Sequence, residues 1–330
     1  MRRSLPFLSV PVWVGASALL LVLAAGWWGR AAPRAPMATI GIVQLTAVDA
    51  ATVEGFKAHL AELGYREGRD VHYRYPGPAG SIERLAPMIA DHLAAGVDLL
   101  LVSSTPAAVA AQAATAHTAV PVVFAPVNDP VKAGVVKSLQ SPGGNLTGVR
   151  LPQGDAIRLQ WLVKLAPQVR HILFPHNPND PSALESLRQI QAVSAALGIT
   201  LVTQPLPTTE AMEAGLRAPP QVDAILLPRD SSVEARIADY VALARERKIP
   251  LCVPSLTQVH AGALVSYGFV HYEIGRQAAR MAHQILGGTP PGDLPVETAL
   301  SSLAINLRTA QAIGLSVSPQ ILRSAHTIVR

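Results

Sequence analysis

Charged residues are scarce in this sequence. They make up 15% of its 330 residues, whereas hydrophobic residues make up 49%. This composition provides ample apolar material for one large domain or for two of about 150 residues each, and it excludes a globally disordered chain. Four positive charges are arginines within residues 1–36, which hold no acid, so the rest of the chain carries 5 − 4 = +1. The chain also lacks a Lys/Arg stripe interleaved with aromatic residues, which argues against a nucleic-acid-binding surface.

Cysteine is nearly absent, and Cys252 is the only one. It cannot form an internal disulfide, and its setting in KIPLCVPS is typical of a buried strand with no base nearby to activate a thiol. Enzyme motifs are missing as well: there is no G-x-S-x-G elbow, no P-loop and no G-x-G-x-x-G after a strand. His171 and His176 lie at opposite ends of one expected strand, which argues against a metal site. We therefore expect no catalytic residue, no metal and no cofactor.

The N-terminal segment has the layout of a secretory signal peptide. MRR is followed by an apolar run over residues 10–28 and by a spacer of Ala, Pro and Arg. The run is also near the lower length limit for a membrane span. We interpret residues 1–36 as a cleaved signal peptide or, as the alternative, an uncleaved membrane anchor. Both interpretations place residues 37–330 in the periplasm or on the outer face of the cytoplasmic membrane. Because the segment has no Cys, we expect no lipid-anchored Cys at the start of the mature chain.

Short apolar runs alternate with amphipathic stretches from residue 39 onward. TIGIVQL (39–45), VDLLLVSS (97–104) and VPVVF (120–124) are typical of buried strands, VHYRYPG (71–77) alternates like a strand, and the stretches 50–64, 82–96 and 106–117 are expected to be helices. A second series of the same kind follows Gly154. Near-continuous apolar strands that alternate with helices are typical of a parallel sheet covered on both faces. The sequence therefore predicts two doubly wound, Rossmann-like α/β lobes with a ligand-binding cleft at the carboxyl ends of their strands.

The tail of the chain is expected to return to the first lobe, which gives about three hinge crossings. We expect these crossings near residues 150–155, 260–262 and 289–295. The expected division is a first lobe of residues 37–152 plus 262–290 and a second lobe of residues 153–261 plus 291–330.

Polar residues follow the expected strands at the edge of this cleft. Ser104 and Thr105 precede a helix, whose first N–H groups suit a carboxylate. Asp230 follows VDAILLPR in the second lobe, where it could receive an ammonium group. Asn177 and Tyr267 are two further residues at strand ends. Each of these residues could instead cap a helix or shape a turn, so ligand contact and capping both stay open at this point.

The stretch VNDPVKAGVVKSLQSPGGNLTGV (127–149) is interpreted mainly as defining the fold. Pro130 cannot continue a strand, and Gly143–Gly144 permits a turn before the next strand. Asp129, at the rim of the cleft, stays a candidate for contact with a ligand or with the hinge.

Several long stretches of the sequence carry a resemblance to one family. They are STPAAVAAQAAT, DPVKAGVVKSLQSPGGNLTGV, VDAILLPRDSSV and HAGALVSYGFVHYEIGRQAARMAHQILGG, and the similarity extends over nearly all of residues 39–325. The sequence resembles the ABC-transporter substrate-binding family that includes the tryptophan/tyrosine-binding proteins. The resemblance implies a type I periplasmic-binding-protein fold, export, and delivery of a small solute to a membrane permease. It also implies ligand contacts near Thr105, Asp129, Asn177, Asp230 and Tyr267. The pocket-lining loop QLTAVDAAT is shorter than is usual in the family, which leaves the solute open.

We therefore expect an extracytoplasmic, monomeric solute-binding protein of an ABC import system. Its ligand would be a small carboxylate-bearing solute, an amino acid or an analogue, that the protein passes to an ABC permease. Ser104 and Thr105 would meet the carboxylate, and Asp230 would meet the ammonium group. The alternative is a membrane-anchored, ligand-sensing lobe coupled to a signalling partner. An enzyme would need an acid/base pair facing the cleft, and the sequence shows no partner for Asp230.

Overall fold

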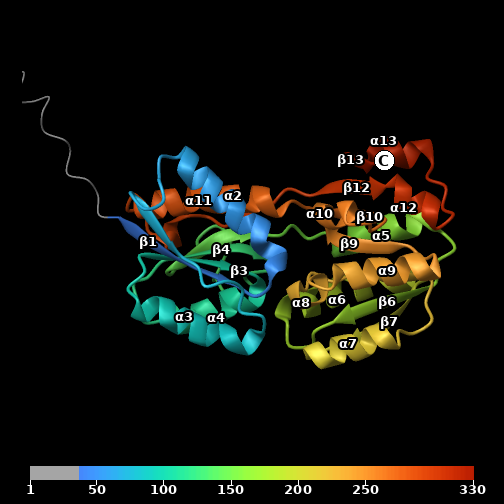
Figure 1. The fold of residues 1–330 in the computed structure, drawn as a ribbon, viewed down its shortest axis with the longest axis horizontal. Helices are drawn as coiled ribbons and strands as arrows, with labels where there is room; N and C mark the ends of the chain where they lie inside the picture. Colours follow the sequence, from blue (N-terminus) through green and yellow to red (C-terminus); the bar gives the residue numbers. More distant parts are fainter. Residues whose placement is uncertain (1–36) are drawn as a thin grey trace, which may run out of the picture. The chain divides into compact units, whose positions relative to one another are not determined.

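The protein is described by a computed structural model that covers residues 37–330, so the expected signal peptide or anchor lies outside the described residues. From Ala38 to Arg330 the chain forms two α/β lobes, each built on its own sheet (Figure 1). Between residues 37 and 330, no helix is long and apolar enough to cross a membrane.

The first lobe contains a six-stranded sheet with the order β11-β5-β4-β3-β1-β2, in which every pair is parallel. Its strands are β1 (Ala38–Gln44), β2 (Val71–Arg74), β3 (Leu99–Ser103), β4 (Val122–Val127), β5 (Leu146–Arg150) and β11 (Glu297–Thr298). Its helices are α2 (Ala50–Glu62), α3 (Leu85–Ala94), α4 (Thr105–Thr115) and α11 (His271–Leu286), with the 3-10 turns η1 (Ala47–Asp49), η2 (Ile82–Arg84) and η4 (Pro291–Asp293).

Alternate residues of these strands enter two separate cores. Ile40 and Leu101 pack with α2 and α11 on one face, whereas Val43 and Leu100 pack with α3 and α4 on the other. Figure 1 shows these two helix pairs on opposite sides of the sheet. Because successive side chains of a strand point to opposite faces, an apolar run such as LLLV contributes side chains to both cores.

The second lobe contains a seven-stranded sheet with the order β13-β12-β10-β9-β8-β6-β7, in which only the β10–β12 pair is antiparallel. Its strands are β6 (His171–His176), β7 (Thr200–Pro205), β8 (Ala224–Leu226), β9 (Leu251–Ser255), β10 (Val265–Phe269), β12 (Ser302–Asn306) and β13 (Thr327–Val329). Its helices are α5 (Asp155–Leu165), α6 (Pro181–Ser194), α7 (Thr209–Arg217), α8 (Ser231–Glu234), α9 (Ile237–Arg247), α10 (Leu256–His260), α12 (Leu307–Ala312) and α13 (Pro319–Ser324), with the 3-10 turn η3 (Ala195–Leu197).

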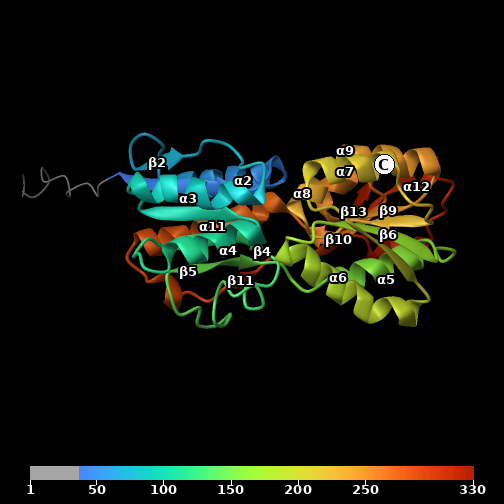
Figure 2. The ribbon, with the colours of Figure 1, turned by 90° about the horizontal axis from the view of Figure 1, so that it is seen from below.

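Helices cover both faces of this second sheet too. Figure 2 shows α5 and α6 on one side and α7 and α9 on the other. Cys252 lies in β9 and is fully buried among the residues that α5 covers. Burial raises the pKa of its thiol to about 12, so this cysteine is a neutral core residue, as expected.

The chain crosses between the lobes three times, which confirms the predicted two-lobe fold class. The crossings lie between β5 and α5, between β10 and α11, and between β11 and β12. The second and third differ from the expected positions. Residues 262–269 were assigned to the first lobe, but β10 pairs with β9 and β12 of the second sheet. Residues 297–298 were assigned to the second lobe, but β11 pairs with β5 of the first sheet. An apolar run identifies a buried strand without identifying the sheet that it joins, so these boundaries were wrong.

Helix α11 returns to the first lobe and packs closely against α2. A side-chain carbon on Gly275 would lie 2.0 Å from the carbonyl oxygen of Thr52, and one on Gly55 would lie 2.0 Å from that of Tyr272. Only glycine at these two positions lets the helix backbones approach this far. The close contact anchors the returning helix on the first lobe.

Candidate functional site

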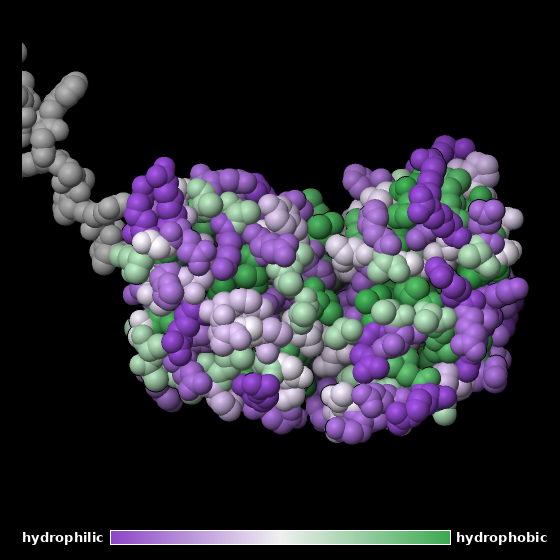
Figure 3. Space-filling model, viewed as in Figure 1, coloured by the Kyte–Doolittle hydropathy of each residue, from purple (hydrophilic) through white to green (hydrophobic). Residues whose placement is uncertain are grey.

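The carboxyl ends of strands from both lobes meet around a small cavity. Its volume is ≈ 20 Å³, and its lining comes from the first lobe (Asp49, Ser104, Thr105, Pro126, Asn128, Leu151 and His271) and from the second (Asp180, Ser182, Arg229, Ser231, Glu234 and Phe269). Figure 3 shows the surface indented between the two lobes. A space of this size holds about one water molecule, so the lobes lie against each other here.

Three hydrogen bonds and an ion pair join the lobes around this cavity. Asn128 follows β4, and its Nδ2 donates to the carbonyl oxygen of Ser182 at 3.1 Å. Its Oδ1 accepts from Nη1 of Arg229 at 2.9 Å. Thr46 Oγ1 donates to the carbonyl oxygen of Ser231 at 3.2 Å, and Nζ of Lys132 lies 2.7 Å from Oε1 of Glu185 at the rim. These contacts form only when the lobes are apposed.

Arg229 brings a positive charge to the cavity from the end of β8. Its side chain is buried, and Nη1 also donates to the carbonyl oxygen of Pro152 at 2.7 Å. Its Nε lies 3.3 Å from Oδ1 of Asp155. Burial lowers the pKa of Arg229, while Asp155 acts in the opposite direction. Nη2 has no hydrogen-bond partner among the described residues, so one face of the guanidinium is free to donate.

Asp155 fixes the position of Arg229 by pairing with its guanidinium. It is fully buried at the start of α5, where it also pairs with Arg158 and accepts a hydrogen bond from Ser186 Oγ at 2.9 Å. Burial opposes its ionisation, but Arg229 and Arg158 hold the pKa of Asp155 below its usual range. An ionised carboxylate between two guanidiniums leaves this region with an excess of positive charge.

Carboxyl groups line the other side of the cavity. Asp49 Oδ1 lies 3.3 Å from Nε2 of His271, whereas its Oδ2 is buried without a hydrogen-bond partner among the described residues. Glu234 accepts a hydrogen bond from Gln258 at 2.7 Å, and no cation of residues 37–330 forms an ion pair with it. Burial raises the pKa of Glu234 well above its usual value, and the negative charge of Asp49 adds to this. A cationic group placed here would be attracted to both acids.

Asp180 adds a third acid to the lining. It caps α6 by accepting a hydrogen bond from the backbone N–H of Ser182 at 2.7 Å. Burial raises the pKa of Asp180 well above its usual value, and the charge of Asp230 contributes further. The lining of the cavity therefore combines three acids with Arg229.

Two of the predicted site residues, Ser104 and Thr105, line the cavity. Ser104 has a φ of 94°, which is rare outside glycine, and its Oγ caps α4 by accepting from the N–H of Ala107 at 3.3 Å. Thr105 Oγ1 accepts from the N–H of Asn128 at 3.1 Å. Both residues therefore fix the strand ends of the first lobe, and they direct the start of α4 towards the cavity.

Asp230 is not part of the lining. Its side chain is 0% exposed, and its oxygens accept hydrogen bonds from the backbone N–H groups of Asn177 (2.7 Å), Ser232 (3.0 Å) and Val233 (3.2 Å). Burial raises its pKa to about 6, against the effect of these three donors. The carboxylate that we expected to meet an ammonium group therefore accepts hydrogen bonds from backbone N–H groups instead. It caps α8 and links this helix to Asn177, which follows β6.

The remaining predicted residues lie around the cavity rather than in it. Asn177 lines a neighbouring pocket of ≈ 390 Å³ between the lobes, together with Thr46. Asp129 lines another of ≈ 280 Å³ on a different side, where it lies 3.6 Å from Lys132 Nζ. Tyr267 is half-buried in the core that α5 covers, and its ring would lie 3.6 Å from a side-chain carbon on Gly154 at the first crossing.

Sequence analysis missed the charged residues that line the cavity. Arg229 directly precedes Asp230, so the strand end was identified correctly but the wrong neighbour was chosen. Asp49 lies in the loop after β1 that the resemblance had marked as pocket-lining, and its charge was the available signal. Glu234 and His271 gave no such signal, because a buried acid on a short helix and a helix-starting histidine look like ordinary surface residues in sequence.

Comparisons with known proteins agree with this geometry. Residues 37–329 match the model of a family described as "ABC transporter substrate binding protein". A tyrosine-binding protein of Clostridioides difficile (strain R20291) is 26% identical over 281 residues, which are 84% of this chain and 81% of that protein.

Solved structures are similar over most of the chain. A conserved domain protein from Vibrio cholerae has a TM-score of 0.81 at 28% identity, covering 89% of this chain and 100% of its own. A Streptococcus pneumoniae ABC domain in complex with L-Trp has a TM-score of 0.80 at 26% identity, with the same coverages. A ligand-free, open substrate-binding protein from Clostridium difficile has a TM-score of 0.63 at 25% identity, covering 89% of this chain and 99% of its own.

Proposed function

Since this chain belongs to the ABC transporter substrate-binding protein family, which binds small solutes outside the cytoplasm and works with an ABC permease, we propose that its solute is an amino acid held between the two lobes. The observation that carries the proposal is that Arg229 and Asp49, which line one cavity, each have a charged group with an atom, Nη2 and Oδ2, that has no hydrogen-bond partner among the described residues. A zwitterion supplies a partner for each.

The carboxylate of the solute is assigned to Arg229 and to the start of α4. Arg229 offers a free N–H donor that Asp155 holds in place, and a guanidinium is well suited to a carboxylate. Ser104 and Thr105 bring the N-terminus of an 11-residue helix to the same cavity. The positive end of its dipole favours an anion.

The ammonium group is assigned to Asp49 and Glu234, in place of Asp230. Asp49 comes from the first lobe and Glu234 from the second, so an ammonium group between them would contact both lobes. Two acids that face one dry space repel each other, and a cation removes this repulsion. Ligand binding would thereby stabilise the apposed arrangement of the lobes.

The size of the cavity indicates that the lobes must separate to admit the solute. A cavity of ≈ 20 Å³ is far smaller than the few hundred Å³ of an ordinary ligand pocket. At nearly equal identity, the chain is more similar to the complex with L-Trp (TM-score 0.80) than to the ligand-free, open structure (0.63). An aromatic side chain is the first to test, because one relative is named as a tyrosine-binding protein, a similar structure is a complex with L-Trp, and Phe269 lines the cavity.

The mature protein is further proposed to be a monomer that is exported by its N-terminal segment, either as a cleaved signal peptide or as an anchor. The positively charged start and the apolar run of residues 10–28 support the export of the protein.

The function is tested by isothermal titration calorimetry with L-tyrosine and L-tryptophan. Tyramine, which lacks the carboxylate, and 3-(4-hydroxyphenyl)propionate, which lacks the ammonium group, are the matched controls. We expect an L-amino acid to bind and both controls to lose most of the affinity. A thermal-shift screen of all the common amino acids covers other side chains, since a ligand at 100 times its Kd adds about 2.7 kcal/mol of stability. Failure of every zwitterion to bind would refute the proposal.

A further inference from the structure

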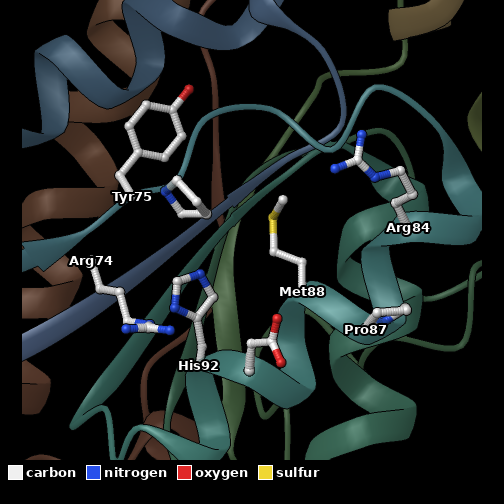
Figure 4. Close-up of a pocket in the computed structure, with 8 residues that line it drawn as sticks. Arg74, Tyr75, Arg84, Pro87, Met88 and His92 are labelled. Atoms are coloured by element: carbon white, nitrogen blue, oxygen red, sulfur yellow. The ribbon is translucent and has the colours of Figure 1, made fainter.

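A larger cavity lies within the first lobe. It has a volume of ≈ 480 Å³, and it shares no lining residue with the cavity between the lobes. Figure 4 shows its residues around one hollow, which is bounded by the end of β2, the loop that follows it and α3. The volume is within the range of ordinary small-molecule sites.

The cavity has two arginines without partners. Arg74 at the end of β2 and Arg84 in η2 both line it, and the side chain of neither forms an ion pair or hydrogen bond with another residue in the range 37–330. In Figure 4 they reach the hollow from opposite sides. Asp91 is the only carboxylate among the lining residues, so the lining carries an excess of positive charge. Two separate guanidiniums at one concave site favour an anion.

His92 adds a buried hydrogen-bond acceptor. The side chain is 1% exposed and lines the cavity from α3; Figure 4 shows its ring between Arg74 and Met88. Nε2 lies 3.2 Å from the carbonyl oxygen of Ile42. A carbonyl can only accept, so Nε2 carries the proton and Nδ1 presents a lone pair. Nδ1 is buried and has no hydrogen-bond partner in the described part of the chain.

A glycine in β1 leaves space for the ring of His92. A side-chain carbon on Gly41 of β1 would lie 3.0 Å from Nδ1 of His92, so a larger residue there would displace the ring. Burial lowers the pKa of His92, and the charge of Arg74 lowers it further, while the Ile42 carbonyl and Asp91 act in the opposite direction. The imidazole is therefore neutral at pH 7, which keeps the Nδ1 lone pair available.

We propose that this cavity is a second binding site, for a small organic acid with an apolar body and a hydroxyl group. The positive charges of Arg74 and Arg84 attract its carboxylate. Pro76, Pro87 and Met88 pack against its body, and its hydroxyl donates to Nδ1 of His92. The site is independent of the amino-acid site between the lobes, and it would let a second solute bind to the same protein.

4-Hydroxybenzoate combines the three features in one probe. We would measure its binding to the full chain by isothermal titration calorimetry. Benzoate lacks the hydroxyl and 4-hydroxybenzyl alcohol lacks the carboxylate, so we expect both to bind at least fivefold more weakly. The double variant Arg74→Gln/Arg84→Gln should lose at least tenfold in affinity. Arg323→Gln, which changes an exposed arginine of α13, is the matched control and should bind like the parent.

A second variant separates this site from the cleft. Arg229→Met removes the cation of the cavity between the lobes, and it should leave the affinity for 4-hydroxybenzoate unchanged. The proposal is overturned if the parent does not bind 4-hydroxybenzoate at millimolar concentration, if the double variant binds as tightly as the parent, or if Arg229→Met abolishes binding.

Discussion

Asn128 and Arg229 form a hydrogen bond of 2.9 Å that joins the end of β4 in the first lobe to the end of β8 in the second. The same amide donates to the carbonyl oxygen of Ser182, so both of its polar ends are used by the opposite lobe. The bond also occupies Nη1 of Arg229, whereas Nη2 has no hydrogen-bond partner among the described residues. This contact therefore contributes both to the apposition of the lobes and to the orientation of the proposed carboxylate-binding group.

The acids of the cavity should control affinity for a zwitterion. We expect Asp49→Asn and Glu234→Gln each to weaken binding of the identified amino acid by about 2–5 kcal/mol, because each removes a buried carboxyl group that would pair with the ammonium group. Calorimetric titration measures the loss. Asp293→Asn, in η4 and away from the cavity, is the control and should bind normally. Parent-like affinity in both acid variants would refute the assigned ammonium site.

Asp155→Ala should destabilise the fold by about 3–5 kcal/mol, since it leaves Arg158 and Arg229 buried without their shared carboxylate. Urea unfolding followed by circular dichroism measures the change. The control is Asp239→Ala, which breaks an exposed pair with Arg236 that is worth at most about 1 kcal/mol. Equal effects of the two substitutions would contradict the importance of the buried network.

Gly275→Val should loosen the first lobe. The new side chain would meet the backbone of α2 at Thr52, and overpacking of this kind costs about 1–3 kcal/mol or more. The free energy of unfolding is again the measurement. Gly144→Ala is the matched control, because a carbon there meets nothing within 4 Å. If Gly275→Val were as stable as this control, α2 and α11 would not pack as described.

Asp230→Asn tests the role of this residue through pH. The folded pKa of about 6 lies above the unfolded value of about 3.9, so the group's favourable contribution is present below pH 4 and is lost as the pH rises through 6. The side chain of Asp230→Asn does not titrate, so the variant's stability lacks this dependence on pH. The variant also loses the carboxylate oxygen that accepts from the backbone N–H of Asn177. Its stability relative to the parent should therefore rise by about 2 kcal/mol between pH 4 and pH 8.

Urea unfolding of both proteins at the two pH values measures this difference. Asp230→Ala, which removes all three acceptor contacts, should lower stability at both. A constant difference between parent and Asp230→Asn across the range would contradict the raised pKa.

Local pattern was sufficient to predict most helices and strands. The strand expected at residues 97–104 contains β3 (Leu99–Ser103), and the Ser104–Thr105 helix start is the beginning of α4. Both follow from capping residues and periodicity, which act over a few residues. The sheet joined by β10 depends on contacts with distant strands, and no local signal encodes them.

The site was predicted only in part for a related reason. Arg229 and Asp230 occupy the same strand end, and an isolated acid suggested an ammonium partner. The structure shows that three backbone N–H groups use Asp230, whereas the neighbouring arginine reaches the cavity. Which of two adjacent polar residues faces a cavity depends on where the other lobe supplies donors, and that is not visible in a single sequence.

The return of α11 to the first lobe affects the order in which the protein can fold. The core beneath α2 includes Ile274, Ala278 and Met281, and the edge strand β11 follows later still. The second sheet in turn needs β12 and β13 from the end of the chain. Neither lobe is therefore a contiguous segment, and a growing chain cannot complete the core of either lobe until α11 or β12 has been made. Truncation before residue 265 would leave both cores open, so we expect no fragment of that kind to fold independently.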